Sequence, residues 1–273
     1  MMVRKKIKTH IRRETRRFDR NDKSHQLVCA KASYIWIYGR HAVQAALNNP
    51  DRGVESLLAT KNATNDLSIP TGIMQTIASP NDLESVVPRD AVHQGCAVKV
   101  KPLEACHIND LAPNEKVPAP LVIVLDQVTD PHNVGAVARS AAAFGVSAII
   151  LPDRKAAPES GAMAKTACGG LEFVPIIRTV NLVQTLGQLK AMGYWTLGFD
   201  SNSVQTLEYV ADNLYDTPTV IVVGSEGYGL RHLTREHCDH VARIPMTPFM
   251  ESLNVSNATA IALYALSIRK LSG

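Results

Sequence analysis

The chain has 273 residues, of which 45% are hydrophobic and 20% are charged, and its formal net charge is +4. This composition is typical of a globular protein, and the length suffices for two domains of ordinary size. We expect no membrane association and no secretion signal, because no apolar run approaches the ~20 residues of a membrane span and none lies near the start.

The first 33 residues are strongly basic. They hold 11 Lys or Arg and three Asp or Glu, so of the 29 basic and 25 acidic residues 18 and 22 remain for the rest, whose net charge is −4. Such a segment buries little apolar surface, and we expect it to be disordered when free. A solubilising tail and a mitochondrial-type presequence are open alternatives, but we favour an electrostatic grip on the phosphates of a nucleic acid.

Ordered structure is expected from Tyr34 onward. The stretch IWIYGRHAVQAALNN predicts a short strand and a helix with Val43, Ala46 and Leu47 on one face. VESLLAT, TGIMQTIAS and AVHQGCAVKVKPL predict further short elements. We therefore expect a small α/β domain over residues 34–105. The proline-containing stretch that follows, CHINDLAPNEKVPAP, predicts a linker over residues 106–119.

Residues 120–273 alternate between apolar strands and helices. Strands are predicted in VSAIIL, LEFVPII, GYWTLGF and PTVIVVG, and helices near 159–168, 181–192 and 256–270. This alternation indicates an α/β domain with a mostly parallel sheet covered on both faces.

The first polar motif lies in a βαβ unit, LVIVLDQVTDPHNVGAVARSAAAFGVSAIIL, residues 121–151. A strand, a polar corner that ends at Asn133 and a helix closing at Gly145 lead into a second strand, and such units bind ligands where strand meets helix. Arg139 stands in a helix otherwise made of small residues, which indicates an anion or a reacting group nearby. Asn133 alone is equally explained as the helix N-cap.

The second motif, VIVVGSEGYGL (residues 220–230), runs from a buried strand into a glycine-rich turn with Glu226. Its glycines allow close backbone approach or positive φ. The order is GxxGxG rather than GxGxxG, and no GxxxxGK[ST] motif occurs, which argues against an NAD-type oxidoreductase and a nucleoside triphosphatase. A plain strand-to-helix turn stays open.

The third motif is IPMTPFMESLNVSNATAIALYAL, residues 244–266. Ser252, Asn254 and Ser256 precede a helix that we expect to bury Ile261, Tyr264, Ala265 and Ile268. Any of the three could cap this helix, but there are more polar groups than one cap requires. The surplus indicates ligand contacts.

Five cysteines are scattered without a CxxC pair: Cys29, Cys96, Cys106, Cys168 and Cys238. We expect reduced, mostly buried thiols of a cytoplasmic protein. The run His237–His240 could ligate a metal, but no second ligand pair has zinc-like spacing. We therefore interpret it as a helix end and predict no metal site.

Together the three motifs resemble those of the SPOUT superfamily, specifically the TrmH-type RNA ribose 2′-O-methyltransferases. The segments are DPHNVGAVARSA, VVGSEGYGLR and the whole third motif, and YGRHAVQAAL and VHQGCAVKVKP resemble that family's ribosomal-protein-like RNA-binding domain. VTDPHNVGA, KTACGGLEFVPIIRTVNL and LTREHCD are most similar to the RlmB branch, which methylates a guanosine ribose of 23S rRNA.

The resemblance implies a SPOUT (α/β trefoil knot) catalytic domain over 120–273 behind a smaller N-terminal RNA-binding domain. It implies S-adenosylmethionine as methyl donor, RNA as substrate and a homodimer with active sites near the subunit interface. The catalytic set that it implies is Asn133, Arg139, Glu226, Ser252 and Asn254. The residues implied to bind the donor are Gly224, Ile244, Met246 and Leu253.

Two alternatives stay open beside the 23S rRNA enzyme. One is a tRNA ribose methyltransferase of the same fold, and the other is a non-catalytic RNA-binding or ribosome-assembly factor. One departure concerns the segment Pro248–Glu251, which is bulkier than the small-residue loop usual in this branch.

Overall fold

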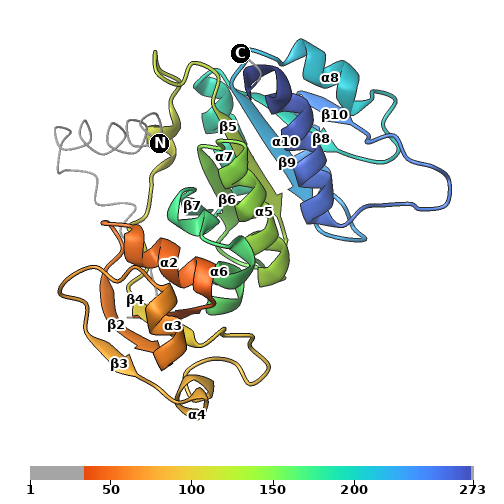
Figure 1. The fold of residues 1–273 in the computed structure, drawn as a ribbon. Helices are drawn as coiled ribbons and strands as arrows, with labels where there is room; N and C mark the ends of the chain where they lie inside the picture. The colour runs from red at the N-terminus through yellow and green to blue at the C-terminus, as the bar shows by residue number, and fades with distance from the viewer. Residues whose placement is uncertain (1–33, 272–273) are drawn as a thin grey trace.

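The computed structural model describes the backbone of residues 34–271 and the side chains as far as Ile268. The basic arm predicted over residues 1–33 lies outside this range. Two bodies are visible in Figure 1, each built on its own β-sheet, and the smaller one is formed by the N-terminal part of the chain. The predicted α/β architecture with a smaller N-terminal domain is confirmed.

The first domain contains a four-stranded sheet in the order β1–β4–β2–β3. Strand β4 is antiparallel to both of its neighbours, and β3 is parallel to β2. The strands are β1 (Ile35–Tyr38), β2 (Val54–Ala59), β3 (Gln75–Ile77) and β4 (Cys96–Val100). Its helices are α2 (Arg40–Asn48), α3 (Lys61–Asp66) and α4 (Pro80–Glu84). Helix α2 buries the predicted face, with Val43, Ala46 and Leu47 inside.

The second domain contains a six-stranded parallel sheet in the order β10–β8–β9–β5–β6–β7. Its strands are β5 (Leu121–Asp126), β6 (Ala148–Pro152), β7 (Ile176–Thr179), β8 (Trp195–Phe199), β9 (Thr219–Gly224) and β10 (His240–Ala242). Every residue of β5, β6 and β9 is buried. This matches their continuous apolar runs, because a central parallel strand is covered on both faces.

Helices cover this sheet on two sides. Helices α5 (Pro131–Ala143), α6 (Gly161–Ala167), α8 (Leu207–Asn213) and α10 (Val255–Leu271) pack on the face of Ile123 and Ile221 (Figure 1). The opposite face, with Val122 and Val220, packs against α7 (Leu182–Ala191) and, behind it, α9 (His232–Glu236). The segments η2 (Ile108–Leu111) and η3 (Gly170–Glu172) are short 3₁₀ turns.

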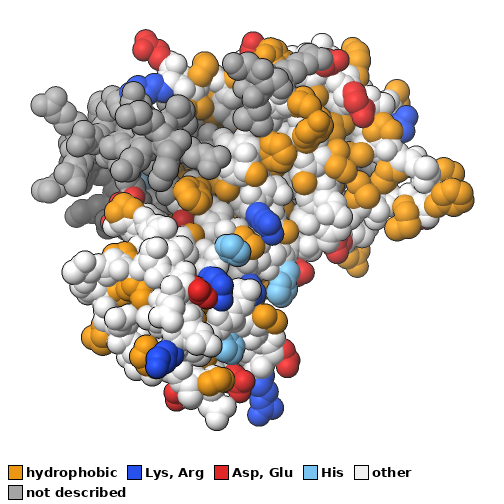
Figure 2. Space-filling model, viewed as in Figure 1, with side chains coloured by type: hydrophobic (Ala, Val, Ile, Leu, Met, Phe, Trp, Pro, Cys, Tyr) orange, Lys and Arg blue, Asp and Glu red, His pale blue; other side chains and the backbone are white. Residues whose placement is uncertain are grey.

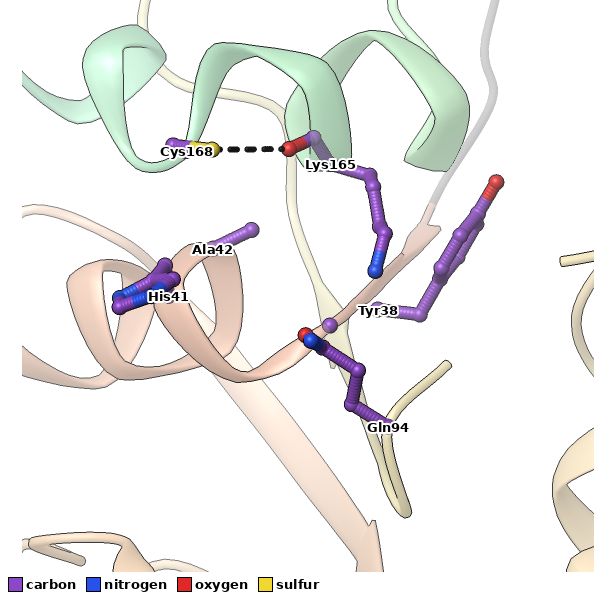
Figure 3. A pocket seen from close by; sticks show the side chains of 7 residues that line it. Tyr38, His41, Ala42, Gln94, Lys165 and Cys168 are labelled. Carbon is purple, nitrogen blue, oxygen red and sulfur yellow. Dashed lines mark hydrogen bonds between the residues drawn. The ribbon is translucent and has the colours of Figure 1, made fainter. Parts of the chain in front are cut away.

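The two domains share one apolar core rather than meeting at a polar surface. The core of the first domain and the α5 face of the sheet form a single cluster that passes through α6. Gly161 at the start of α6 lies so close to β1 that a Cβ there would be 2.3 Å from the carbonyl oxygen of Trp36. Lys165 of α6 also donates a hydrogen bond to the carbonyl of Val92, beside a small cavity between the domains (Figure 3). Helix α6 is thus the joint between the domains.

Two sequence predictions are wrong in detail. LEFVPII was predicted as one strand, but its first residues form the turn η3 and the strand begins at Ile176. Helix α10 was expected to bury Ile261, Tyr264 and Ile268, yet these side chains are 40%, 56% and 37% exposed. Ala265 is partly buried as it packs against the core, and the buried residues of α10 are Val255, Thr259, Ala262, Leu263, Leu266 and Ser267. Helix α10 is apolar nearly all round, so its pattern does not define one face.

No disulfide joins two of the four described cysteines, and these residues are less buried than expected. Only Cys96 is buried, Cys106 and Cys238 are partly so, and Cys168 is exposed. Burial raises the pKa of the Cys96 thiol to about 11. Among the described residues no helix combines the length and apolar character that crossing a bilayer requires.

Candidate active site

Three residues from three distant motifs meet at the carboxyl-end edge of the parallel sheet. Asn133 Nδ2 donates a hydrogen bond to Glu226 Oε1 at 2.9 Å. Asn254 Nδ2 donates to the same oxygen at 2.5 Å and to Asn133 Oδ1 at 3.0 Å. We refer to Asn133, Glu226 and Asn254 as the Asn–Glu–Asn cluster. Asn133 is partly buried and the other two are exposed, so the cluster is open to a ligand.

Local capping explains how the two asparagines are held. Asp130, not Asn133, is the N-cap of α5 and accepts a hydrogen bond from the backbone N–H of His132. The side chain of Asn133 is therefore left to reach Glu226. Asn254 has two roles, because its Oδ1 also accepts from the backbone N–H of Ser256 at 2.8 Å and so caps α10.

The glycines of the second motif bring Glu226 to this position. A Cβ on Gly224 would lie 2.0 Å from the carbonyl carbon of Gly229, so the turn can fold back over the end of β9 only because residue 224 has no side chain. Gly227 and Gly229 have φ angles of +84° and +66°, which strain other L-residues. The prediction of positive φ is confirmed at Gly227 and Gly229, while Gly224 allows a close approach to the chain's own backbone.

Arg139 and Ser252 are not joined to the cluster by side-chain contacts. Arg139 is exposed on α5, six residues beyond Asn133, which corresponds to about 9 Å along the helix axis. Its guanidinium makes no hydrogen bond or ion pair with another described residue. Ser252 is exposed in the segment before α10. Both side chains are therefore available to an incoming ligand.

The backbone that carries Arg139 is tightly packed. A Cβ on Gly170, in the turn η3, would lie 2.6 Å from the carbonyl oxygen of Ala138 and 3.1 Å from Cα of Arg139. The backbone that carries the exposed Arg139 side chain is therefore held in a fixed position.

The residues expected to bind a methyl donor lie at the same edge, in the segments that follow β9 and β10. Gly224 is buried at the end of β9. In the long segment before α10, Ile244 and Leu253 are partly exposed and Met246 is exposed. Between Ile244 and Leu253 the backbone makes one hydrogen bond within the segment, from Met250 N–H to Thr247 C=O. Exposed apolar side chains beside unpaired backbone polar groups fit the flat faces and polar edge of an adenine ring.

Sequence reasoning missed a buried carboxylate at the end of β5. Asp126 ends β5 with its side chain fully buried, and Arg231 Nε lies 2.8 Å from its Oδ1. The hydroxyl of Thr234 donates to Oδ2 of Asp126 at 2.8 Å. A charged residue at the end of an otherwise apolar strand was the available signal, because a buried carboxylate requires partners.

The predicted helix end at His237 is observed, since α9 stops at Glu236 and His237 is its C-cap. Asp239 accepts hydrogen bonds from Lys190 and Thr196. No group of three or more His, Cys, Asp or Glu side chains suited to a metal ion occurs among the described residues.

Comparison with protein families gives two matches that together cover nearly all of the two domains. Residues 120–264 match the SpoU rRNA Methylase family, and residues 36–106 match the family described as RNA 2′-O ribose methyltransferase substrate binding.

Several curated proteins are similar over most of the chain. The 23S rRNA (guanosine-2′-O-)-methyltransferases RlmB of Photorhabdus laumondii and Pseudomonas aeruginosa are 40% and 37% identical, over 84% of this chain and 95% and 94% of theirs. An uncharacterised tRNA/rRNA methyltransferase of Synechocystis is 38% identical, and the match spans 61% of that longer protein.

Solved structures share the fold. The SpoU methyltransferase AviRb of Streptomyces viridochromogenes, determined with the cofactor AdoMet, has a TM-score of 0.73 at 22% identity and covers 89% of this chain and 92% of its own. An AdoMet-bound rRNA methyltransferase of Sinorhizobium meliloti has a TM-score of 0.70 at 21% identity, covering 87% and 88%. The family matches, the identity to curated relatives and the shared fold agree, and the chain belongs to the SpoU rRNA methylase family.

Proposed function

We propose that this protein transfers a methyl group from S-adenosylmethionine to a ribose 2′-hydroxyl of RNA, specifically of a guanosine in 23S rRNA. The observation that carries the proposal is the Asn–Glu–Asn cluster, in which three motifs far apart in the sequence share hydrogen bonds. The RlmB proteins at 37–40% identity support the choice of 23S rRNA. We place this activity in the cytoplasm, where the substrate is made.

We assign the methyl donor to the segments around Gly224, Ile244, Met246 and Leu253. When bound, S-adenosylmethionine would supply the sulfonium methyl group: its bond to sulfur would break as the bond to the ribose 2′-oxygen forms, S-adenosylhomocysteine would leave, and the 2′-hydroxyl proton would pass to water. Backbone groups of these segments would hydrogen-bond the adenine, and Ile244, Met246 and Leu253 would cover its faces. We also propose the trefoil knot of the family for the chain after β9.

In this proposal the Asn–Glu–Asn cluster positions the site. The Glu226 carboxylate binds the start of α5 to the start of α10, so both helices keep a fixed relation to the segment after β9. Ser252, two residues before Asn254, is placed to contact the ribose. None of these side chains needs to gain or lose a proton to do this.

Arg139 is the residue that we assign to the RNA itself. A guanidinium stays protonated in proteins, so it is a poor acceptor for the 2′-hydroxyl proton. It is suited to grip the adjacent phosphate and orient the ribose. Orientation can contribute ~7–11 kcal/mol, whereas a general base contributes only ~10²–10⁴-fold in rate, roughly 3–5 kcal/mol.

The roles that we propose follow the two domains of the fold. We assign RNA binding to residues 34–105, a linking role to 106–119 and catalysis to 120–273, with the basic arm as an additional contact to RNA phosphates. The family match of residues 36–106 to a substrate-binding family supports this assignment.

We further propose that the protein acts as a homodimer through the outer face of α10. Ile261, Tyr264 and Ile268 lie exposed along this helix, and the Tyr264 ring contacts Phe144 of α5 edge-on. Hydrophobic side chains gather over α10 in Figure 2. Exposed apolar patches of this kind mark association sites. Sedimentation equilibrium at micromolar protein tests the proposal, and a monomer there contradicts it.

The activity is tested with the full chain, labelled S-adenosylmethionine, and unmethylated 23S rRNA and tRNA transcripts in parallel. We expect label in 23S rRNA, at a ribose that is also unmethylated in cells lacking the gene. Label in tRNA alone would replace the substrate by tRNA. No label, together with no donor binding by calorimetry at millimolar concentration, would leave an RNA-binding factor without catalytic activity.

A further inference from the structure

A large cleft lies at the carboxyl-end edge of the parallel sheet, away from the Asn–Glu–Asn cluster. Its volume is about 880 Å³, and it is formed by the segments that follow β5, β6 and β7 together with the start of α9. This is within the usual size range of ligand sites. The lining residues that matter below are Gln127, Arg154, Lys155, Asn181, Arg231 and His232.

The cleft and the Asn–Glu–Asn cluster both lie at the carboxyl-end edge of the sheet, but on opposite faces of it. The cluster belongs to the side of α5 and α10, whereas the cleft is lined by the start of α7 and by α9, which lie on the other side. The ends of β5 and β9 separate them, where Asp126 pairs with Gly224. A strand of RNA that crosses this edge would reach both places.

The cleft is lined by cationic side chains, although the two domains together carry a net negative charge. Residues 34–273 carry a net charge of −4 with His counted as neutral, yet Arg154, Lys155 and Arg231 line this cavity, in which Asp153 is the one lining carboxylate; Arg231 is also paired with the buried Asp126. Arg154 and Lys155 make no hydrogen bond or ion pair with any other described residue. Unpaired cations gathered in a cleft raise the local concentration of anions.

Arg231 is held in place for such a role. Its Nε is paired with the buried Asp126, which also accepts hydrogen bonds from the backbone N–H of Arg231 and from the hydroxyl of Thr234. This fixes the guanidinium at the rim while its two terminal nitrogens make no hydrogen bond with another described residue. A fixed guanidinium loses less entropy on binding a phosphate than a free one.

The loop that carries Arg154 and Lys155 is also braced. Arg178 donates a hydrogen bond to the carbonyl of Ala157 at 2.5 Å, and the N–H of Ala157 donates to Val128 at 3.3 Å. Lys155 and Gln127 have φ angles of +58° and +61°, which are uncommon for residues other than glycine. Such backbone persists only where its surroundings enforce it.

We propose that this cleft binds the phosphodiester backbone of the RNA that flanks the methylated ribose. The inference rests on the proposed function, since it takes RNA as the substrate. Arg154, Lys155 and Arg231 contact phosphate oxygens, and Gln127 and Asn181 supply amide groups for hydrogen bonds to the sugar. The RNA strand is therefore gripped on one side of the sheet edge and methylated on the other.

The test uses the full-length Arg154→Ala/Lys155→Ala double variant, in which neither truncated side chain has a partner within the described protein. RNA affinity is measured without methyl donor, by fluorescence anisotropy of a labelled single-stranded 20-mer of uridine and of a 23S rRNA transcript, over a series of salt concentrations. Removing one cation from a phosphate lowers the slope of log affinity against log salt by roughly 0.7, so a decrease of about 1.4 is expected.

The matched control exchanges the two residues, Arg154→Lys with Lys155→Arg, and keeps the charge. We expect it to retain the wild-type slope, and we expect donor binding by calorimetry to be unchanged in both variants. With methylation as readout, the double alanine variant should raise KM for RNA and leave kcat within about twofold, because the two cations bind the RNA equally well before and during methyl transfer.

An unchanged slope and affinity in the double alanine variant would overturn the proposal. So would loss of binding to inorganic phosphate or free nucleotide with RNA affinity intact, since the cleft would then be a small-anion site. If the wild type binds RNA through this cleft but methylates no RNA, the proposed function is contradicted. The assignment of the cleft to RNA binding is still supported in that case. Normal methylation with a salt slope that does not depend on the cleft would sink the cleft assignment and leave the proposed function standing.

Discussion

Arg52 of the first domain and Glu172 of the second form a buried ion pair, with Nη2 2.6 Å from Oε1 and side-chain exposures of 0% and 4%. Asn49 Nδ2 donates to the other carboxylate oxygen at 2.6 Å. Glu172 ends the turn η3, whose Gly170 packs on the backbone of Arg139. The pair therefore connects the first domain to the helix that carries Arg139.

Replacing Arg52 with alanine should destabilise the protein strongly. The variant leaves Glu172 buried without its cation, and breaking one partner of a buried pair costs ~3–5 kcal/mol. Urea denaturation measures the change. The control is Arg40→Ala, which breaks the exposed pair with Asp66 and should cost only ~0–1 kcal/mol. Equal losses in both variants would contradict a special role for the buried pair.

Glu159, which lies 3.4 Å from Arg52, should make stability depend on pH. Burial raises the pKa of Glu159 from 4.5 more than Arg52 lowers it. A carboxyl that binds its proton more tightly when folded stabilises the protein below pH 4.5, and this contribution is lost as pH rises through the raised pKa.

In the Glu159→Gln variant the side chain at this position does not titrate. As pH rises from about 4 to 7, the free energy of unfolding of the variant should therefore increase relative to that of the wild type. Denaturant unfolding at each pH measures the difference. A difference that stays constant across this range would rule out the raised pKa.

Glu226→Gln should impair methyl transfer with little effect on stability. The change keeps the side chain's size but removes the charge that accepts hydrogen bonds from Asn133 and Asn254. Hydrogen bonds to a charged group contribute ~1.5–3 kcal/mol, which corresponds to a loss of ~10- to 150-fold if fully expressed in kcat. Single-turnover methylation and thermal unfolding are measured together. A fall in melting temperature that accounts for the lost activity would reduce Glu226 to a structural residue.

Arg139→Lys separates a guanidinium requirement from a requirement for charge alone. Lysine keeps the cation but loses the planar fork that grips a phosphate through two bonds. We expect kcat for RNA methylation to fall by at least about 100-fold, while calorimetric binding of S-adenosylmethionine is retained. Near-normal turnover would show that the guanidinium has no specific role.

Gly224→Ala should abolish donor binding, whereas Gly187→Ala should stabilise the protein. At Gly224 the new Cβ would lie 2.0 Å from backbone of Gly229, so the turn must open and donor binding should be lost. Gly187 lies inside α7 with nothing within 4 Å of its Cβ position, and alanine there should stabilise by ~0.5–1 kcal/mol. Calorimetry and urea denaturation report the two effects. Intact donor binding in Gly224→Ala would place the donor elsewhere.

Strand positions in the second domain could be predicted because β5, β6 and β9 contain continuous apolar runs, which are typical of parallel strands covered on both faces. The exposed face of α10 could not, since apolar residues surround that helix and only its neighbours decide which of them are buried. Short elements such as α8 and β10 also escaped prediction, because seven and three residues give too little periodicity.

The same contrast holds for the candidate site. Polar residues in motifs beside buried strands indicate ligand contacts, but only the resemblance to a family implies a catalytic set that contains Asn133, Glu226 and Asn254. The link between Arg52 and Glu172 spans 120 residues, and nothing local in either segment indicates its partner. Resemblance to a family identified the motifs, while tertiary contacts alone revealed how the domains are joined.

The joint at Gly161 restricts how this architecture can diversify. The first domain packs on α6, which belongs to the second domain. A different N-terminal domain therefore cannot be acquired by simple fusion at the linker. Any transplanted module would need to bring α6 and a compatible acidic turn with it. Changes of RNA target in such proteins should therefore arise by gradual surface substitution, with the two halves inherited as one unit.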